Sequence, residues 1–468
     1  MIKDPRQIAL NILVSWDKSF HTLDKILENH SEEISFLPKK DKSLCNALIF
    51  GVLRHRESLD WTLRAFSKIP LGKIDISLLY LLRIALFQLQ HMERIPFFAA
   101  INTTVDIAKK LFGKKAAGFT NAVLRNTAEN FSKVVLPDPK KDRAKFISVK
   151  FSLPLWLSKR WNHNFGFEQA CLLCQQINTI PKITLRTNTL KGDRQSLAQS
   201  LSSIAQNIKL TDYASQGISF TNPSIPIQEF EAFKLGLFQV QDEAAQIVTQ
   251  FLAPKPFEKI LDACAGLGGK TGHIAQLMEN KGSIIAADVD PKKLESLELE
   301  SRRLGIDIIQ TKPLNLKETS IKDFDFYFDR VLLDAPCTGL GVLRRNPDTK
   351  WDRSKKDIAR LSAQQKKLLN EAANLVKPGG LLVYAVCSCE KEENEEVIHK
   401  FLEKRKDFSI DKEFKSSNYD KLMPNLIPSL ISGLIPNLIS GEGFLKTYPD
   451  ANNMDGFFAA RLRRKYKS

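Results

Sequence analysis

The sequence contains no uninterrupted run of about 18 apolar residues, the minimum length for a helix that crosses a bilayer. Its first residues, Met-Ile-Lys-Asp-Pro-Arg, also lack the apolar core of about 7–15 residues that a secretory leader carries. From these two absences we expect neither a membrane span nor a classical export signal. We therefore expect a protein of the cytoplasm.

Cysteine is scarce, with seven residues in a chain of 468. An odd number of cysteines spread over a long chain does not form the dense disulfide framework of small secreted domains. Cys171 and Cys174 have CxxC spacing, but no second pair accompanies them and their surroundings have a helical pattern. This favours a buried structural pair over a zinc site, and we expect no metal.

Acidic residues are outnumbered, since 53 Asp and Glu stand against 69 Lys and Arg, which gives a net charge of +16. Such a balance favours a polyanionic partner, and nucleic acid is the leading candidate. Charge alone leaves open a basic surface that serves only solubility. The basic run at 461–467, Arg-Leu-Arg-Arg-Lys-Tyr-Lys, favours the nucleic-acid interpretation.

The length of 468 residues predicts roughly three domains, at about 100–200 residues for each. Residues 1–135 show helical spacing of apolar residues throughout. Residues 136–245 begin with a linker rich in proline and charge and continue with a small α/β module. In residues 246–468 strands and helices alternate, which predicts a parallel sheet with helices on both faces. The strands expected there are 259–263, 283–289, 306–310, 330–334 and 381–386.

A tandem duplication of eight residues with one change occupies residues 426–441. Its prolines forbid a regular helix, and two copies are too few for a solenoid. We interpret it as an expanded surface loop, with an apolar contact patch as the alternative.

A glycine-rich turn follows the first expected strand of the last domain. Its candidate cofactor-binding residues are Cys264, Ala265, Gly266, Leu267, Gly268, Gly269 and Lys270. The turn lacks the first glycine of a phosphate-binding P-loop, because Cys264 occupies that position, and Thr271 interrupts the dinucleotide pattern. Asp288, at the end of the second strand, lies 22 residues beyond Gly266, where a carboxylate can accept hydrogen bonds from ribose hydroxyls.

A cofactor with a ribose and no pyrophosphate fits this turn, and S-adenosylmethionine is such a molecule. The alternative is a glycine turn that only lets the strand and the following helix pack closely. A helix that begins at the turn would point its positive end at the ligand.

Two cysteines stand at the ends of two further apolar strands: Cys337 in Asp-Ala-Pro-Cys-Thr-Gly (334–339) and Cys387 in Tyr-Ala-Val-Cys-Ser (384–388). Open α/β sheets bind ligands at the carboxyl ends of their strands, so a thiol there can act as a nucleophile beside the cofactor. A thiolate that adds to C6 of cytosine makes C5 able to accept a methyl group. The alternative is that each cysteine is a small apolar residue buried at a strand end.

These two segments resemble the fourth and sixth motifs of the RNA cytosine-C5 methyltransferase family of Sun/Fmu type. The match continues through residues 340–351 and 389–395, and through 236–242 and 455–461. The resemblance implies that Cys387 is the nucleophile and that Cys337 assists product release. It also implies that Asp334 binds the cytosine edge, stabilises the adduct and lies at the cofactor.

Residues 1–135 are similar to the NusB antitermination fold, notably at 100–109 and 121–125. The resemblance therefore implies a multidomain chain: an all-α NusB-like RNA-binding domain, a small α/β middle module and a Rossmann-like class I methyltransferase domain. Within the family, the NusB-like attachment marks the bacterial enzyme that methylates 16S ribosomal RNA of the small subunit. The implied partner is that RNA.

The chain departs from the family pattern at several positions. Leu267 stands where the family usually has Pro, Val386 where it has Thr, and Asn315 where it has an Asp for the adenine, which predicts weaker or altered cofactor binding. Cys389 is an extra thiol that would point the same way as Cys387 if both were in extended structure, and it could replace the nucleophile or oxidise with it.

Two other functions stay open at this point. The same chemistry could act on transfer RNA or on another ribosomal site. Alternatively, the methyltransferase domain could be degenerate, as Asn315 and Leu267 hint, in an RNA-binding assembly factor. Retention of both thiols and Asp334 argues against that second alternative.

Overall fold

The computed structural model describes residues 4–319, 321–411 and 438–466. The chain forms two compact units, each discontinuous in sequence. The helical unit comprises Met1–Thr179 with Arg345–Ser354, and the sheet unit comprises Ile180–Arg344 with Lys355–Ser468.

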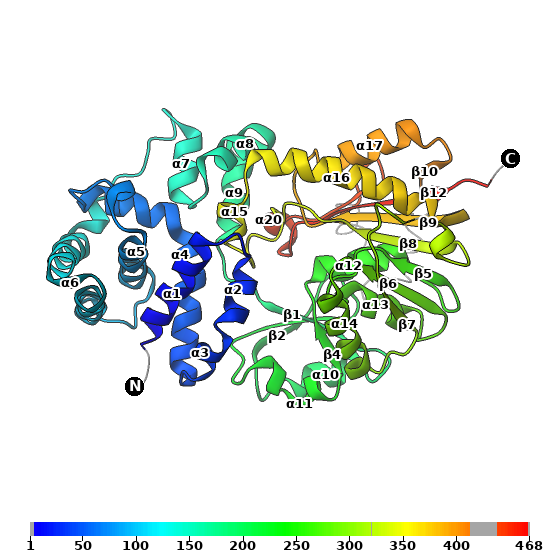
Figure 1. The fold of residues 1–468 in the computed structure, drawn as a ribbon, viewed down its shortest axis with the longest axis horizontal. Helices are drawn as coiled ribbons and strands as arrows, with labels where there is room; N and C mark the ends of the chain where they lie inside the picture. The colour runs from blue at the N-terminus through cyan, green and yellow to red at the C-terminus, as the bar shows by residue number, and fades with distance from the viewer. Residues whose placement is uncertain (1–3, 320, 412–437, 467–468) are drawn as a thin grey trace. The chain divides into compact units, whose positions relative to one another are not determined.

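The helical unit contains neither strand nor sheet among its described residues (Figure 1). Its α-helices are α1 (Pro5–Lys18), α2 (Leu23–Asn29), α3 (Ser31–Ser35), α4 (Lys39–Phe66), α5 (Ile76–His91), α6 (Phe97–Asn130), α7 (Arg143–Lys150), α8 (Leu155–Phe165), α9 (Phe167–Ile177) and α15 (Thr349–Asp352). Two 3-10 turns, η1 (Leu71–Lys73) and η2 (Phe131–Lys133), complete it. The helical pattern predicted for residues 1–135 is thus observed.

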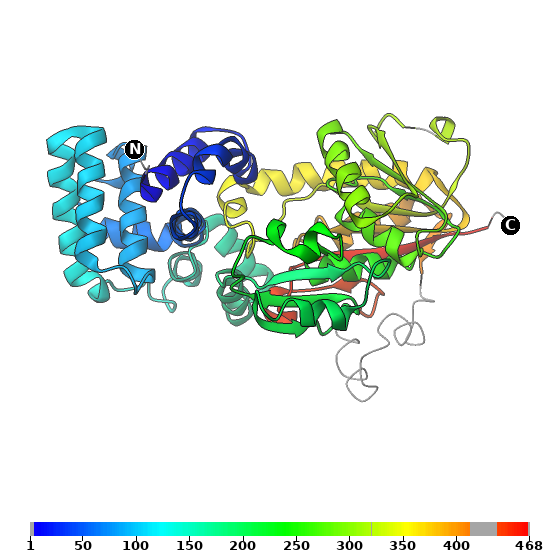
Figure 2. The ribbon, with the colours of Figure 1, turned by 90° about the horizontal axis from the view of Figure 1, so that it is seen from below.

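Local sequence signals start these helices, and an apolar core holds them together. The Asp4 carboxylate accepts a hydrogen bond from the backbone N–H of Arg6 at the start of α1, and Asp75 caps α5 in the same way. Helix α5 is buried on nearly every side because it lies among α1, α4 and α6 (Figure 2). A helix that is apolar on all its faces is typically buried at the centre of a domain, and α5 has this place in the helical unit.

The segment 345–354 packs into the helical unit although it follows the fourth motif in sequence. Lys350, which is 1% exposed, donates a hydrogen bond from Nζ to the carbonyl oxygen of Arg54 at 2.8 Å. The Trp351 Nε1–H donates to the carbonyl of Leu53 at 2.6 Å. The helical unit therefore includes a piece of chain from the middle of the methyltransferase motifs.

The sheet unit begins with a small antiparallel module. Its strands β1 (Ile183–Thr187), β2 (Gln206–Leu210), β3 (Gly217–Thr221) and β4 (Phe238–Val240) lie in the order β2-β3-β1-β4. With them go α10 (Arg194–Ser200), η3 (Ile227–Glu229) and α11 (Glu231–Lys234). Apolar side chains such as Leu185, Phe220 and Phe238 form the core of this module.

The main sheet has the strand order β10-β12-β9-β8-β5-β6-β7, with β11 paired to β12. Its strands are β5 (Lys259–Asp262), β6 (Ser283–Asp288), β7 (Ile309–Pro313), β8 (Phe328–Asp334), β9 (Val376–Val386), β10 (Phe408–Ile410), β11 (Leu445–Lys446) and β12 (Phe458–Arg464). The associated helices are α12 (Glu243–Leu252), α13 (Gly269–Leu277), α14 (Pro291–Leu304), α16 (Lys355–Asn374), α17 (Glu395–Lys404), α20 (Pro449–Asn452) and the 3-10 turn η4 (Ile321–Asp323).

Alternate residues of the main strands face two separate cores. Leu261, Val331 and Leu382 pack with α16 and α17 on one face. The neighbouring residues Leu332 and Val383 pack with α12 and α13 on the other face. Figure 1 shows α16 and α17 on one side of the main sheet and α12 and α13 on the other side. Strands buried on both faces read as continuous apolar runs, which is why the sequence revealed them.

The prediction of a parallel sheet is correct for only part of it. Strands β7, β6, β5, β8 and β9 are parallel, but β12 runs antiparallel to β9, and β10 and β11 run antiparallel to β12. From residue 438 to β12 the described chain holds one helix, the short α20, and no crossover helix. Instead, the preceding loop stays at the carboxyl edge, where the Gly456 N–H donates to the Gly341 carbonyl at 2.8 Å, so β12 must enter the sheet from that edge.

The structure also bears on smaller expectations. Arg461 and Arg463, from the basic run, form ion pairs with Asp411 at 2.9 and 3.1 Å, so part of that run stabilises the fold. Of the CxxC pair, Cys174 is buried in α9 and Cys171 is partly exposed. The duplication 426–441 falls outside the described residues up to position 437. Within the described chain, no helix combines the length and apolarity that a bilayer crossing requires.

Candidate active site

The glycine-rich turn joins β5 to α13 and is held against the end of β6. Gly266 and Gly268 adopt positive φ angles of +56° and +82°, which L side chains rarely adopt. The Gly266 N–H donates to Asp288 Oδ2 at 2.9 Å, and the Asp290 N–H donates to Oδ1 of the same carboxylate at 2.9 Å. The predicted turn and the predicted ribose acceptor are therefore in direct contact.

Asp262, the last residue of β5, holds the two ends of the turn together through a hydrogen bond to α13. The Thr271 hydroxyl on α13 donates to Asp262 Oδ2 at 2.7 Å. Burial raises the pKa of Asp262 to about 7, although the Thr271 hydrogen bond acts in the opposite direction. The carboxylate is 1% exposed, so its part is to fix strand to helix.

Lys270 of α13 and Asp334 of β8 form an ion pair in which Nζ lies 2.6 Å from Oδ2. Burial acts to lower the pKa of Lys270, but the Asp334 carboxylate and smaller contributions from Cys387 and Asp262 raise it above its ordinary value. Lys270 is consequently a fixed positive charge at the carboxyl ends of β5 and β8.

Cys337 and Cys387 lie side by side, with 3.3 Å between their Sγ atoms. Both thiols are partly exposed, and each follows the carboxyl end of its strand, β8 or β9. The pKa of Cys337 is raised well above its usual value, first by the hydrogen bond that its thiol shares with Cys387 and then by burial. Cys337 is therefore a neutral thiol.

A buried carboxylate, Glu393, ties the two cysteine loops together. It accepts hydrogen bonds from the Thr338 N–H at 2.9 Å, the Thr338 hydroxyl at 2.5 Å and the Ser388 hydroxyl at 2.6 Å. Gln365 of α16 donates to it at 3.0 Å. Residues 338 and 388 directly follow the two cysteines, so Glu393 fixes the separation of their sulfur atoms.

Two predicted residues do not join this cluster. Asn315 is exposed after β7, and its Nδ2 donates to Glu318 at 2.6 Å. Cys389 is 5% exposed, and a Cβ on Gly456 would lie 2.8 Å from its sulfur. Because β9 ends at Val386, the extended backbone that would align Cys389 with Cys387 is absent, and Cys337 takes the place beside Cys387.

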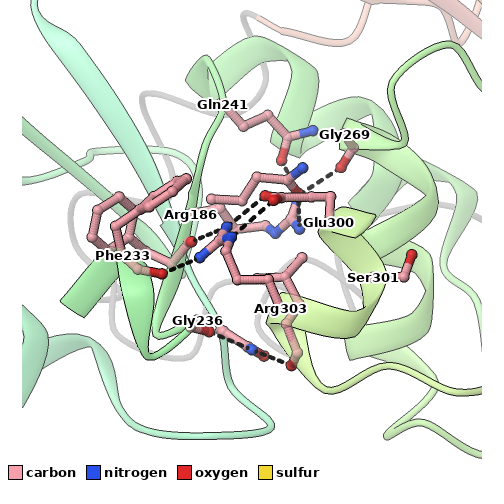
Figure 3. A network of polar contacts seen from close by, with 12 residues as sticks. Arg186, Phe233, Gly236, Gln241, Gly269, Glu300, Ser301 and Arg303 are labelled. Carbon is pink, nitrogen blue, oxygen red and sulfur yellow. Dashed lines mark hydrogen bonds and ion pairs between the residues drawn. The ribbon is translucent and has the colours of Figure 1, made fainter. Parts of the chain in front are cut away.

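Sequence reasoning missed two contributors. Glu393 lies inside a quoted motif, but its role depends on contacts 55 residues away in sequence. Arg186 lies in β1, outside the cofactor motifs, yet its Nη1 donates to the carbonyl oxygen of Gly269 at 2.7 Å (Figure 3). A basic residue in the short strand Ile-Thr-Leu-Arg-Thr, where no other residue is charged, was the signal that could have revealed it.

The turn and its surroundings suit a nucleoside group without pyrophosphate. A Cβ placed on Gly266 would meet nothing within 4 Å, so there is open space beside the turn. The Asp288 carboxylate borders that space, and the adjacent apolar side chains Leu267 and Val289 are 62% and 69% exposed. In the described part of the chain no three His, Cys, Asp or Glu side chains gather as a metal site would require.

A parallel core with a glycine turn after its first strand, an acidic residue at the end of the second and an antiparallel closing strand defines a Rossmann-like methyltransferase domain. Family models agree. Residues 249–463 match 16S rRNA methyltransferase RsmB/F, residues 3–129 match the NusB family, and residues 153–228 match the ferredoxin-like domain of RsmF/B-like methyltransferases.

The chain belongs to the ribosomal RNA small subunit methyltransferase B family. It is 34% identical to the probable ribosomal RNA small subunit methyltransferase B of Bacillus subtilis, with 98% of each chain covered. The probable enzyme of the same name from Synechocystis is also 34% identical, over 94% of each chain. The NusB-like and Rossmann-like expectations are thus confirmed.

Solved structures give the same result. The crystal structure of PH0851 superposes with a TM-score of 0.77 at 25% identity, covering 98% of this chain and 99% of that one. A methyltransferase homolog from Pyrococcus horikoshii gives a TM-score of 0.56 at 29% identity, covering 68% of this chain and 97% of its own.

Proposed function

We propose that this chain transfers a methyl group from S-adenosylmethionine to C5 of a cytosine in 16S ribosomal RNA, through a covalent adduct between Cys387 and C6. The names of the relatives support the RNA substrate. The observation that carries the chemistry is the pair of sulfur atoms 3.3 Å apart, next to the Lys270–Asp334 ion pair.

S-adenosylmethionine, when bound, supplies an electrophilic methyl group on a sulfonium. The glycine turn would hold it, with Asp288 accepting hydrogen bonds from the ribose hydroxyls. Asp334 borders the same site from the end of β8. The cationic sulfonium is compatible with these carboxylates.

Cys387 is the nucleophile in this proposal because groups on two sides of its sulfur would stabilise a thiolate. The Cys337 thiol shares a hydrogen bond with it, and the Lys270 ammonium is close enough for charges on the two groups to interact. The thiolate would add to C6, the C5–C6 electron pair would shift to C4–C5 and the C4–N3 pair to N3, and N3 would take a proton from solvent, which the Asp334 carboxylate stabilises as a hydrogen-bond acceptor. C5 would then take the methyl group as the sulfonium C–S bond breaks and leaves a neutral thioether, and N3 would return its proton to solvent as the C4–N3 double bond re-forms.

Cys337 acts after methyl transfer. Once Cys387 has formed a thioether, its hydrogen bond and its charge no longer raise the pKa of Cys337, and burial is the main cause that remains. Cys337 can then lose its proton to solvent and remove the proton from C5. The freed electron pair restores the C5–C6 double bond, and the Cys387 thiolate leaves C6.

The test is transfer of labelled methyl from S-adenosylmethionine to unmodified small-subunit ribosomal RNA, with the product nucleoside identified by chromatography and mass. We expect the label in 5-methylcytidine. Label on another nucleoside would contradict the C5 chemistry. Label on transfer RNA alone would show that transfer RNA, and not ribosomal RNA, is the substrate. RNA binding without any methyl transfer would favour the assembly-factor alternative.

A further inference from the structure

The strand β1 of the small antiparallel module contributes a side chain to the methyltransferase domain. Arg186 is 0% exposed, and its guanidinium reaches across to α13 (Figure 3). Nε donates to Gln276 Oε1 at 2.8 Å, Nη2 donates to Gln239 Oε1 at 2.7 Å, and Nη1 donates to the carbonyl of Gly269 at 2.7 Å. Nη1 also donates to Gln241 Oε1.

All four of these acceptors are neutral. Burial lowers the pKa of Arg186 to about 9, while the Glu300 carboxylate acts in the opposite direction. A buried cation is costly unless its donors are satisfied, and here the planar guanidinium is matched by acceptors from two parts of the chain. A lysine has a single nitrogen and cannot reproduce this fork.

The contact with Gly269 places the guanidinium next to the site. Gly269 is the first residue of α13, and its carbonyl belongs to the peptide bond that joins it to Lys270. The Lys270 side chain pairs with Asp334, and the same turn holds Gly266 against Asp288. A shift of this one peptide would therefore move both the cofactor turn and the lysine charge.

Arg186 packs closely against helix α13. A Cβ added to Gly272, on the first turns of α13, would lie 3.3 Å from Nη2 of Arg186 and 3.4 Å from Oε1 of Gln239. The first separation is tighter than most real Cβ contacts, and the second lies at the lower limit of ordinary van der Waals contact. The absence of a side chain at position 272 therefore lets the helix lie directly on the guanidinium.

We propose that Arg186 is a positioning residue for the cofactor site, so that strand β1 of the small module sets the place of the glycine turn and of Lys270. The module then completes the binding site for the methyl donor, besides any contact that it makes with RNA. The inference rests on the proposed use of S-adenosylmethionine and deepens it.

The test compares R186K with R303K in the full-length chain. Arg303 of α14 is a matched control, because it also donates to carbonyl oxygens of the small module, to Phe233 at 2.5 Å (Figure 3) and to Phe238 at 2.9 Å, and none of its hydrogen bonds within the described residues reaches the turn. We expect R186K to raise the Kd and the KM for S-adenosylmethionine about tenfold, with the KM for RNA within about twofold of wild type. R303K should lower the melting temperature and leave the donor Kd unchanged.

An unchanged donor Kd in folded R186K would overturn the inference. If R186K does not fold, G272A replaces it, because its new Cβ presses on the same guanidinium. That variant should weaken donor binding several-fold, and an unchanged Kd would again overturn the inference. Titration of the wild-type chain with S-adenosylmethionine tests the proposed function separately. If the wild-type chain does not bind the donor, the proposed function is wrong.

Discussion

The sulfur atoms of Cys337 and Cys387 lie 3.3 Å apart, although 50 residues separate the two cysteines in sequence. Adjacent parallel strands β8 and β9 bring them together, since the carboxyl ends of parallel neighbours lie at the same edge of a sheet. The pair shares one hydrogen bond, so the state of each sulfur depends on the other.

Substitution of the two cysteines separates their roles. C387A should lower methyl transfer roughly a thousandfold or more, because the covalent route is lost, while the Kd for S-adenosylmethionine stays within about twofold. C337A should instead accumulate a protein–RNA adduct, visible on a denaturing gel. The double variant C337A/C387A is the control and should form no adduct. An adduct in the double variant would assign the nucleophile elsewhere.

Oxidation tests the arrangement of the three nearby thiols. Diamide oxidises two thiols to a disulfide and is itself reduced to the hydrazine, and the sulfurs must approach to about 2.05 Å. We expect a link between Cys337 and Cys387, found by peptide mapping without reductant, with activity lost and then restored by dithiothreitol. C389A should behave like wild type. A link from Cys387 to Cys389 would contradict the geometry.

Glu393 should be essential for stability and activity together. E393Q replaces an acceptor oxygen by an NH2 group that faces the donors of Thr338, Ser388 and Gln365. We expect a loss on the order of 2–4 kcal/mol in the free energy of unfolding, since a buried hydrogen-bonded charge is removed. The matched control E396Q alters an exposed residue of the same helix region and should change neither the urea midpoint nor the methyl-transfer rate.

Asp262 should make stability depend on pH. Burial raises its pKa in the folded chain to about 7 from 3.8. The folded state therefore binds more protons than the unfolded state between about pH 4 and pH 7, and stability falls as the pH rises through this window. Urea titrations should show that the free energy of unfolding of the wild-type chain decreases from pH 5 to pH 8. In D262N that decrease should be smaller by about 2–4 kcal/mol. An identical decrease in both proteins would contradict this assignment.

Much of this architecture could be predicted because the informative signals are local. Buried strands such as β6 and β9 contain runs of consecutive apolar residues, and the glycine turn can be read from its own residues. Asn315 shows what such reading leaves open: it follows β7, is exposed and donates to Glu318, and its contact with the adenine stays a prediction. Where a side chain points depends on packing that sequence spacing does not encode.

The long-range contacts were beyond prediction for a related reason. Arg186 meets Gly269 across 83 residues, and Glu393 meets Thr338 across 55. The mixed character of the main sheet depends on where the loop before β12 lies, which is held by the hydrogen bond between Gly456 and Gly341. Each of these contacts can be inferred only when the positions of two segments far apart in sequence are already known.

The segment 345–354 makes both units discontinuous, so the polypeptide crosses between them three times, at 179/180, 344/345 and 354/355. A single cut cannot release either unit whole. A fragment that begins at residue 180 would carry Lys350 and Trp351 without their acceptors, the carbonyls of Arg54 and Leu53. A gene fusion, truncation or domain exchange that moves the helical unit must therefore include the ten residues 345–354 together with the helices. Otherwise the helical unit loses the part of its core that this segment supplies.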